Sequence, residues 1–184
     1  MSFLRNLLNG AKNWLVSGIK MQSSLAATEP ASSGNWQGDA LCFVLAAERQ
    51  VKLVYLMLDH FLPIHPPLTA EVDLSDEDAG REFADEVEML TYFQDNPTKD
   101  ATRYWYPREN NPADYMVGAH FTSDGHLLLS LTLPGNERDE NQCLAQMKAL
   151  LDSSIGLIWY NSFPEFRDGA DFRQKYSDYF SATT

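Results

Sequence analysis

The stretch YMVGAHFTSDGHLLLSLTLP, residues 115–134, decides the fold of this chain. Two runs rich in strand-forming residues meet at Asp124-Gly125, a dipeptide typical of the tight turn in a β-hairpin. In the second run Leu128, Ser130 and Thr132 alternate with four leucines that share one face: Leu127, Leu129, Leu131 and Leu133. The pattern predicts an antiparallel hairpin over 115–133, with one face packed on a layer of helices.

Two further elements are predicted before the hairpin. Residues 40–58 are almost wholly apolar around a polar centre, and they fit either a hairpin of buried strands or one long buried helix. The β-branched residues Val51 and Val54 favour the hairpin. A helix is predicted over 76–93, because Ser75 offers an N-cap and acidic residues fill the first turn.

The segment after the hairpin adds a helix over 140–151, a strand over 157–161 and a C-terminal helix. The last helix carries aromatic residues at helical spacing, which are more typical of a core than of a ligand site: Phe172, Tyr176, Tyr179 and Phe180. A length of 184 residues with 44% hydrophobic content fits one domain over 40–184. The expected fold is α+β, an antiparallel sheet with helices packed on one face.

Charge is unevenly distributed along the chain. The first 28 residues hold Arg5, Lys12 and Lys20 and no acid, whereas the remainder holds all 26 acidic residues. The formal net charge is -12. This balance argues against unspecific binding of nucleic acid, which depends on Lys and Arg at the phosphates. A basic partner protein is favoured instead.

An amphipathic basic helix is predicted over 1–21. Its apolar stripe includes Phe3, Leu7 and Trp14, opposite the three cations. Such a helix can dock on its own acidic domain, on a partner or in a membrane interface, and an organelle presequence has the same character. Residues 22–39 are rich in Ser, Ala and Gly and are predicted to form a linker.

Cysteine usage and hydropathy indicate a cytoplasmic compartment. Cys42 and Cys143 lie among apolar neighbours without zinc or redox spacing, and we expect reduced core thiols. Polar residues interrupt the N-terminus too often for a secretory signal. No stretch reaches the roughly 18 apolar residues of a membrane span. The remaining route to a membrane is peripheral association through residues 3–20.

The predicted helix over 76–93 lies in an acidic region. Between Asp73 and Asp95 the sequence holds a single base, Arg81, among nine acids. The helix is expected to bury Phe83, Val87 and Leu90 and to turn four carboxylates toward water: Glu82, Asp85, Glu86 and Glu88. The face is either simply solvated or a docking surface for a cationic protein.

Three consecutive aromatic residues form the second candidate surface. Tyr104, Trp105 and Tyr106 cannot all face one core if the segment is extended, because side chains alternate along a strand. Exposed aromatics beside Arg108 have the composition of an interface hot spot. A loop folded over the core would instead bury all three.

No linear signature of an enzyme, metal site or cofactor is present. A two-residue turn at Asp124-Gly125 would pair His120 with Leu129, so that His120 and His126 point to opposite faces and do not form a metal site. Nucleophile elbow, phosphate-binding loop and dinucleotide fingerprint are absent from the sequence. We expect neither cofactor nor metal, and consider an enzyme the less favoured alternative.

These features lead to an expected function in protein binding. In character the chain looks like small acidic bacterial proteins that bind one protein tightly, such as immunity proteins that inhibit toxins. The expectation is a non-enzymatic domain that binds and masks a basic partner. Chaperones of secreted effectors share this character, and a peripheral membrane protein anchored by residues 3–20 is the other alternative.

Overall fold

The computed structural model describes residues 39–65, 81–107, 115–133, 140–160 and 162–180, and the backbone of 73–74. The predicted helix over 1–21 and the predicted linker up to residue 38 lie outside the described residues. Several predicted functional or capping residues lie outside them as well: Phe3, Leu7, Lys12, Trp14, Lys20, Ser75 and Arg108.

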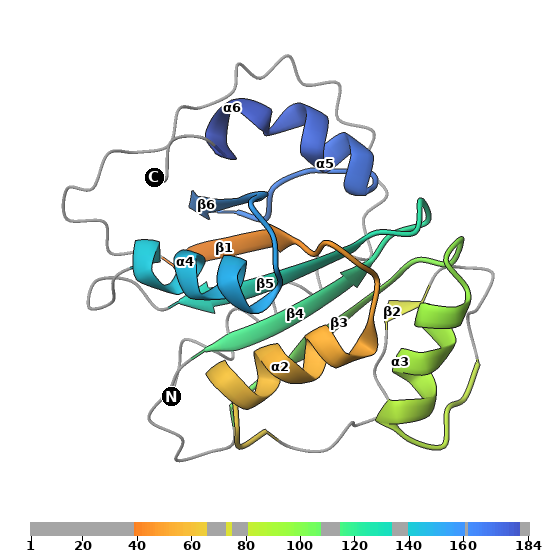
Figure 1. Ribbon diagram of the computed structural model, residues 1–184. Coiled ribbons are helices and arrows are strands. Elements are labelled where there is room, and N and C mark those ends of the chain that lie inside the picture. Colours follow the sequence, from red (N-terminus) through yellow and green to blue (C-terminus); the bar gives the residue numbers. More distant parts are fainter. Residues whose placement is uncertain are drawn as a thin grey trace. The chain divides into compact units, whose positions relative to one another are not determined.

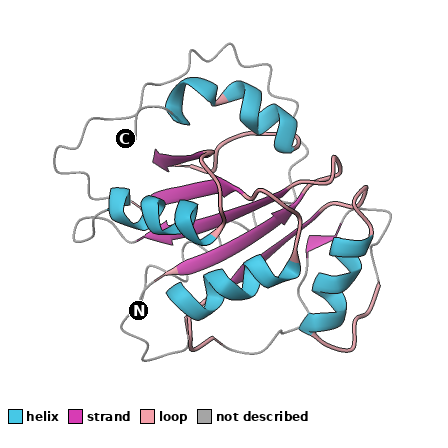
Figure 2. Cartoon of the chain, viewed as in Figure 1, coloured by secondary structure: helices cyan, strands magenta, loops and turns pink. Residues whose placement is uncertain are grey.

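Six antiparallel strands form one sheet in the order β2-β3-β4-β5-β1-β6 (Figures 1 and 2). They are β1 (Ala40–Leu45), β2 (Asp73–Leu74), β3 (Ala101–Trp105), β4 (Met116–Phe121), β5 (Leu127–Leu133) and β6 (Gly156–Tyr160). Strand β1 lies between β5 and β6 although it comes first in the described chain. Every position of β1, β4 and β5 is buried, so both faces are covered at the centre of the sheet.

Three helices pack on the first face: α2 (Val51–Phe61), α3 (Glu86–Asp95) and α4 (Glu140–Leu150). The alternating leucines of β5 that begin at Leu127 share one buried cluster with Met57 of α2, Leu90 of α3 and Leu144 of α4. The predicted hairpin, its packing on helices and the helix over 140–151 are therefore confirmed. Cys42 and Cys143 are buried in the same cluster and form no disulfide, as expected.

The second face carries α5 (Gly169–Lys175) and α6 (Ser177–Phe180), which Figure 1 shows at the top, away from α2 and α3. Phe172 and Tyr176 pack against Phe43, Leu128 and Leu157. The α+β class is confirmed, but the expectation that helices cover only one face is wrong. Strand β1 is apolar on both sides, and burying both sides requires a layer on each.

Residues 40–58 contain a strand followed by the beginning of a helix, so the predicted hairpin of strands is wrong. The strand β1 ends at Leu45, and α2 begins at Val51 after a short polar break. The helical spacing of the buried residues of α2 continues to Phe61, beyond the ambiguous run 40–58. These buried residues are Leu53, Val54, Met57, Leu58 and Phe61. Packing of this stripe outweighs the β-preference of Val51 and Val54.

The acidic helix begins later than predicted. Residues 81–85 are not helical, and Asp85 is the N-cap of α3. Val87 is 58% exposed and does not belong to the buried stripe, which consists of Met89, Leu90 and Phe93. Val87 was predicted to be buried because the helix was expected to start earlier. A different start changes which residues of the helix face the core.

The hairpin register also differs by one residue from the two-residue turn. His120 pairs with Leu128, and Phe121 with Leu127. The Thr122 amide donates to the His126 carbonyl at 3.1 Å, which leaves a loop of three residues with Gly125 at φ +83°. His120 and His126 therefore lie on the same face of the hairpin, and the prediction of opposite faces is wrong.

Candidate functional site

The predicted acidic surface contains carboxylates that stabilise the start of α3. Asp85 accepts a hydrogen bond from the Glu88 amide at 2.8 Å, and Glu88 accepts one from the Ala84 amide at 2.6 Å. The arrangement is similar to a capping box, except that Glu88 bonds to the amide before the N-cap residue and not to that of Asp85 itself. The negative charges also interact favourably with the positive end of the helix dipole. Part of the acidity therefore has a local structural cause.

The aromatic part of the predicted surface is largely in the interior. Trp105 is only 2% exposed, and its indole Nε1 donates to Glu86 Oε2 at 2.7 Å. Tyr104 is half-buried and contacts His120 on the opposite face of β3, and Tyr106 is also half-buried. The structure brings Trp105 together with Glu86, but it does not gather the predicted aromatic residues beside the acids. Trp105 is thereby excluded as an exposed anchor.

What remains exposed at α3 is a smaller surface. Glu82, Asp85, Val87 and Glu88 are all exposed at or just before the start of α3, and we call these four residues the α3 acidic face. The nearby Arg81 stacks on Tyr92, with its guanidinium carbon 3.9 Å from the ring centroid. The α3 acidic face thus combines an exposed apolar group with three carboxylates.

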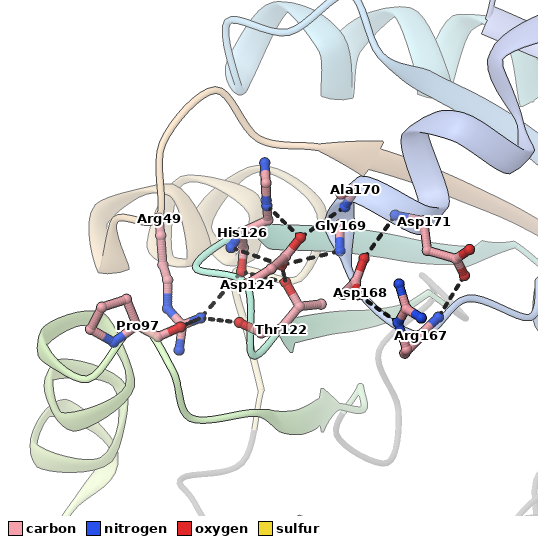
Figure 3. Close-up of polar contacts among 10 residues, drawn as sticks. All are labelled: Arg49, Pro97, Thr122, Asp124, His126, Arg167, Asp168, Gly169, Ala170 and Asp171. Carbon is pink, nitrogen blue, oxygen red and sulfur yellow. Dashed lines mark hydrogen bonds and ion pairs between the residues drawn. The ribbon is translucent and has the colours of Figure 1, made fainter.

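A second polar cluster, which the sequence did not reveal, joins the hairpin turn to the rest of the fold (Figure 3). The Arg49 guanidinium donates to the carbonyl oxygens of Thr122 at 2.6 Å, Lys99 at 2.7 Å and Phe93 at 2.8 Å. Burial lowers the pKa of Arg49 to about 10, so the side chain remains charged at neutral pH. Arg49 ties the end of β1, the end of α3 and the hairpin together.

Asp124 links the same turn to α5 (Figure 3). Its carboxylate accepts from the amides of Ala170 at 2.8 Å and Gly169 at 3.2 Å and from the Thr122 hydroxyl at 2.6 Å. Burial tends to raise the pKa of Asp124, but these hydrogen bonds outweigh it and hold that pKa far below its usual value. His126 Nδ1 lies 2.9 Å from the carboxylate.

A third polar group lies within the sheet on the second face. His120 Nε2 lies 3.0 Å from Ser130 Oγ, and His120 Nδ1 lies 3.3 Å from Thr102 Oγ1. These three side chains, here called the His120 relay, come from β3, β4 and β5. Burial lowers the pKa of His120 to about 4, so its imidazole is neutral at pH 7. The alternation of Ser130 with leucines was visible in the sequence, but the pairing register was needed to place it beside His120.

Aromatic rings surround the His120 relay. The His120 imidazole contacts the rings of Phe43, Tyr104 and Phe166, with centroid distances of 5.6, 5.5 and 6.2 Å. Phe163 contacts Tyr104 and is itself 41% exposed. Burial among these rings disfavours the charged imidazolium, so the imidazole is held neutral with each ring nitrogen beside a hydroxyl.

Metal and membrane features were sought in the described ranges. Among those residues, no three His, Cys, Asp or Glu side chains gather as a metal site would require. None of the helices in the described part is both long enough and apolar enough to cross a bilayer. The chain matches no protein-family model, no curated protein and no solved structure.

Proposed function

We propose that the protein binds a cationic partner protein through the α3 acidic face and masks part of the partner's surface. The observation that supports this best is Val87, which is 58% exposed and lies close in sequence to the exposed carboxylates of Glu82, Asp85 and Glu88. An exposed apolar group near several like charges offers an anchor together with electrostatic selectivity. The net charge of -12 favours encounter with a positively charged surface.

The exposed residues of this face divide into two groups for experiment. Asp85 and Glu88 cap α3, so neutralising either one would also weaken the helix. Glu82 and Val87 are exposed and have no such capping bonds among the described contacts. Glu82→Gln and Val87→Lys therefore test binding with the least effect on folding.

The partner is first isolated by affinity capture from the native host with the full-length protein, and its association is then measured with purified components. Glu82→Gln should slow association several-fold and reduce its salt dependence, while Val87→Lys should raise the dissociation constant at least tenfold. The matched control is Asp178→Asn, which removes one exposed carboxylate from α6 on the second face. Equal kinetics for all three variants and wild type would reject the α3 acidic face.

Masking has its own readout. If the partner is a toxin, a stoichiometric amount of the protein should suppress the toxin's activity. A secretion chaperone would keep its effector soluble and need not inhibit it. Peripheral membrane binding through residues 3–20 remains the alternative suggested by the basic sequence. Flotation with anionic liposomes, with and without those residues, separates membrane binding from protein binding.

A further inference from the structure

The His120 relay has the order of groups used in nucleophilic catalysis. A hydroxyl, Ser130 Oγ, lies 3.0 Å from the imidazole Nε2, and the other ring nitrogen lies 3.3 Å from Thr102 Oγ1. In serine-based acyl transfer the imidazole accepts the hydroxyl proton and a third group orients the ring. We propose that Ser130 is a nucleophile toward small apolar esters, with His120 as its base and Thr102 as the positioning residue. This inference is independent of the proposed partner binding.

The backbone opposite Ser130 leaves space for its hydroxyl. Gly118 pairs with Ser130 across the hairpin, and a Cβ atom at Gly118 would lie 2.3 Å from Ser130 Oγ and 2.9 Å from the Tyr104 ring. No side chain larger than hydrogen fits there without moving Ser130 or Tyr104. Glycine at this position therefore permits Ser130 and His120 to meet.

A second buried hydroxyl lies on the same face of β5. Thr132 is two residues from Ser130 and 8% exposed, and its Oγ1 has no hydrogen-bond partner among the described residues. Buried polar atoms are rarely left without a partner, because the hydrogen bond to water that they lose on burial is then not replaced. The hydroxyl provides an unused donor for a polar atom of a bound ligand.

Phe163 is a partly exposed aromatic residue that contacts the His120 relay. Its ring packs against Phe43 and Tyr104 at centroid distances of 5.9 Å each, and against His120 at 6.5 Å, yet the residue is 41% exposed. Ser130 is fully buried, whereas Phe163, which contacts the His120 ring, is partly exposed at the surface. The aromatic lining favours an apolar acyl group, and removal of the Phe163 ring should widen access.

The proposed step is balanced with groups that the protein and ester supply. The Ser130 Oγ–H proton passes to His120 Nε2 while Oγ bonds to the acyl carbon. Cleavage of the ester bond then releases the alcohol, which takes the proton from His120. Water hydrolyses the acyl-serine in the same way, with His120 again acting as base and then acid.

The test uses the full-length protein and a small alkyl fluorophosphonate. Its phosphorus forms a bond to a reactive serine oxygen, fluoride leaves, and the serine proton passes to the base. Intact mass and peptide mapping should place one adduct on Ser130. The exposed Ser123 and Ser154 serve as internal controls, because they measure reaction without the relay. Labelling should be at least tenfold faster in Phe163→Ala and absent in Ser130→Ala.

A parallel assay with p-nitrophenyl acetate separates labelling from turnover. Wild type should release nitrophenolate faster than Ser130→Ala, and Phe163→Ala should be faster still. Because Ser130→Ala could unfold, the fold of each variant is checked by circular dichroism. The peptide map of the labelled wild-type protein tests the reactivity of Ser130 even if a variant fails to fold. Adducts only on exposed serines, or none on Ser130 even in folded Phe163→Ala, would overturn the proposal.

Discussion

At the scale of single residues, the half-buried Arg49 and the buried His120 hold together segments that are distant in sequence. Arg49 donates to carbonyl oxygens of three segments, and His120 lies between hydroxyls of two neighbouring strands. Neither role follows from hydropathy, because Arg49 lies in a short polar break and His120 in a β-rich run. Both depend on which segments the fold brings together.

Replacement of Arg49 by lysine should destabilise the fold. An ammonium group cannot reach the planar set of carbonyl acceptors that the guanidinium contacts, and hydrogen bonds to charged groups contribute about 1.5–3 kcal/mol each in favourable cases. We expect Arg49→Lys to lower the free energy of unfolding by about 3 kcal/mol in urea titrations. Arg173→Lys, at an exposed position of α5, is the matched control and should change little. Equal losses in the two variants would contradict the role assigned to Arg49.

His120 should make stability depend on pH in the mildly acidic range. Its folded pKa of about 4 lies below the usual value near 6.5, because burial disfavours the charged imidazole. The unfolded chain therefore binds more protons between these values, and stability is lost as pH falls from about 6.5 toward 4. The expected loss is about 3 kcal/mol.

The measurement for His120 compares urea unfolding of wild type and His120→Gln at several pH values. The amide of glutamine cannot titrate, so the variant should lose the part of the pH dependence that lies between about 4 and 6.5. Other groups contribute to both proteins alike and cancel in the difference. Parallel pH curves for the two proteins would show that His120 does not titrate on unfolding.

At the scale of elements, local signals predicted some parts well and tertiary contacts decided others. The hairpin, α4 and β6 were predictable because turn chemistry and side-chain period agreed. The helix α2 was missed for two reasons. Its first turn carries the β-branched residues Val51 and Val54, and its apolar stripe extends to Phe61, beyond the run 40–58 in which the pattern was judged. The start of α3 was misplaced because Ser75 and Asp85 both satisfy the sequence rule for an N-cap. Among the site residues, Trp105 could not be placed without knowing which face of β3 meets α3.

The link between the hairpin turn and α5 gives a prediction at this scale. Asp124 accepts from the first amides of α5, so Asp124→Ala should leave Gly169 and Ala170 without that acceptor. We expect faster hydrogen exchange in α5 and a loss of about 1–2 kcal/mol, the usual range for removal of a cap. Hydrogen exchange in α2 of the same variant should be unchanged, because Asp124 bonds to the amides of α5.

Asp59→Ala provides the control for the Asp124 experiment, since Asp59 is exposed on α2. The contribution of Asp124 also has a defined sign with pH. Its folded pKa is lowered, so its stabilisation is present above the ordinary carboxyl range and is lost as pH falls below it. The difference between wild type and Asp124→Ala should therefore shrink in acid. A constant difference would show that the carboxylate charge does not matter.

At the scale of the whole molecule, net charge is the property that most affects association. With a formal charge of -12, the rate of binding a cationic partner should fall as salt rises from about 20 to 150 mM, because screening shortens the range of attraction. Stopped-flow or surface-based kinetics at four salt concentrations test this. The dissociation rate should change much less than the association rate. An association rate independent of salt would indicate that apolar contact, and not charge, controls encounter.

The composition predicted this acidic character, and the pattern of strands and helices predicted the α+β class, but neither predicted the second helical layer. Residues on both sides of β1 are apolar, which was visible in the sequence, yet the same run also suited a buried helix. Once this run is a strand between β5 and β6, its apolar residues point to both faces of the sheet, and each face needs a covering layer. Likewise, Ser130 and His120 became neighbours only through a pairing register that a three-residue loop sets.

The central position of β1 has a consequence for folding during synthesis on the ribosome. Its two partners, β5 and β6, follow it by roughly 90 and 115 residues. At synthesis rates of about 5–20 residues per second, the apolar nascent strand waits on the order of 5 to 20 s before β5 exists to pair with it. Nascent-chain chaperones should therefore engage residues 40–45 until the hairpin has left the exit tunnel.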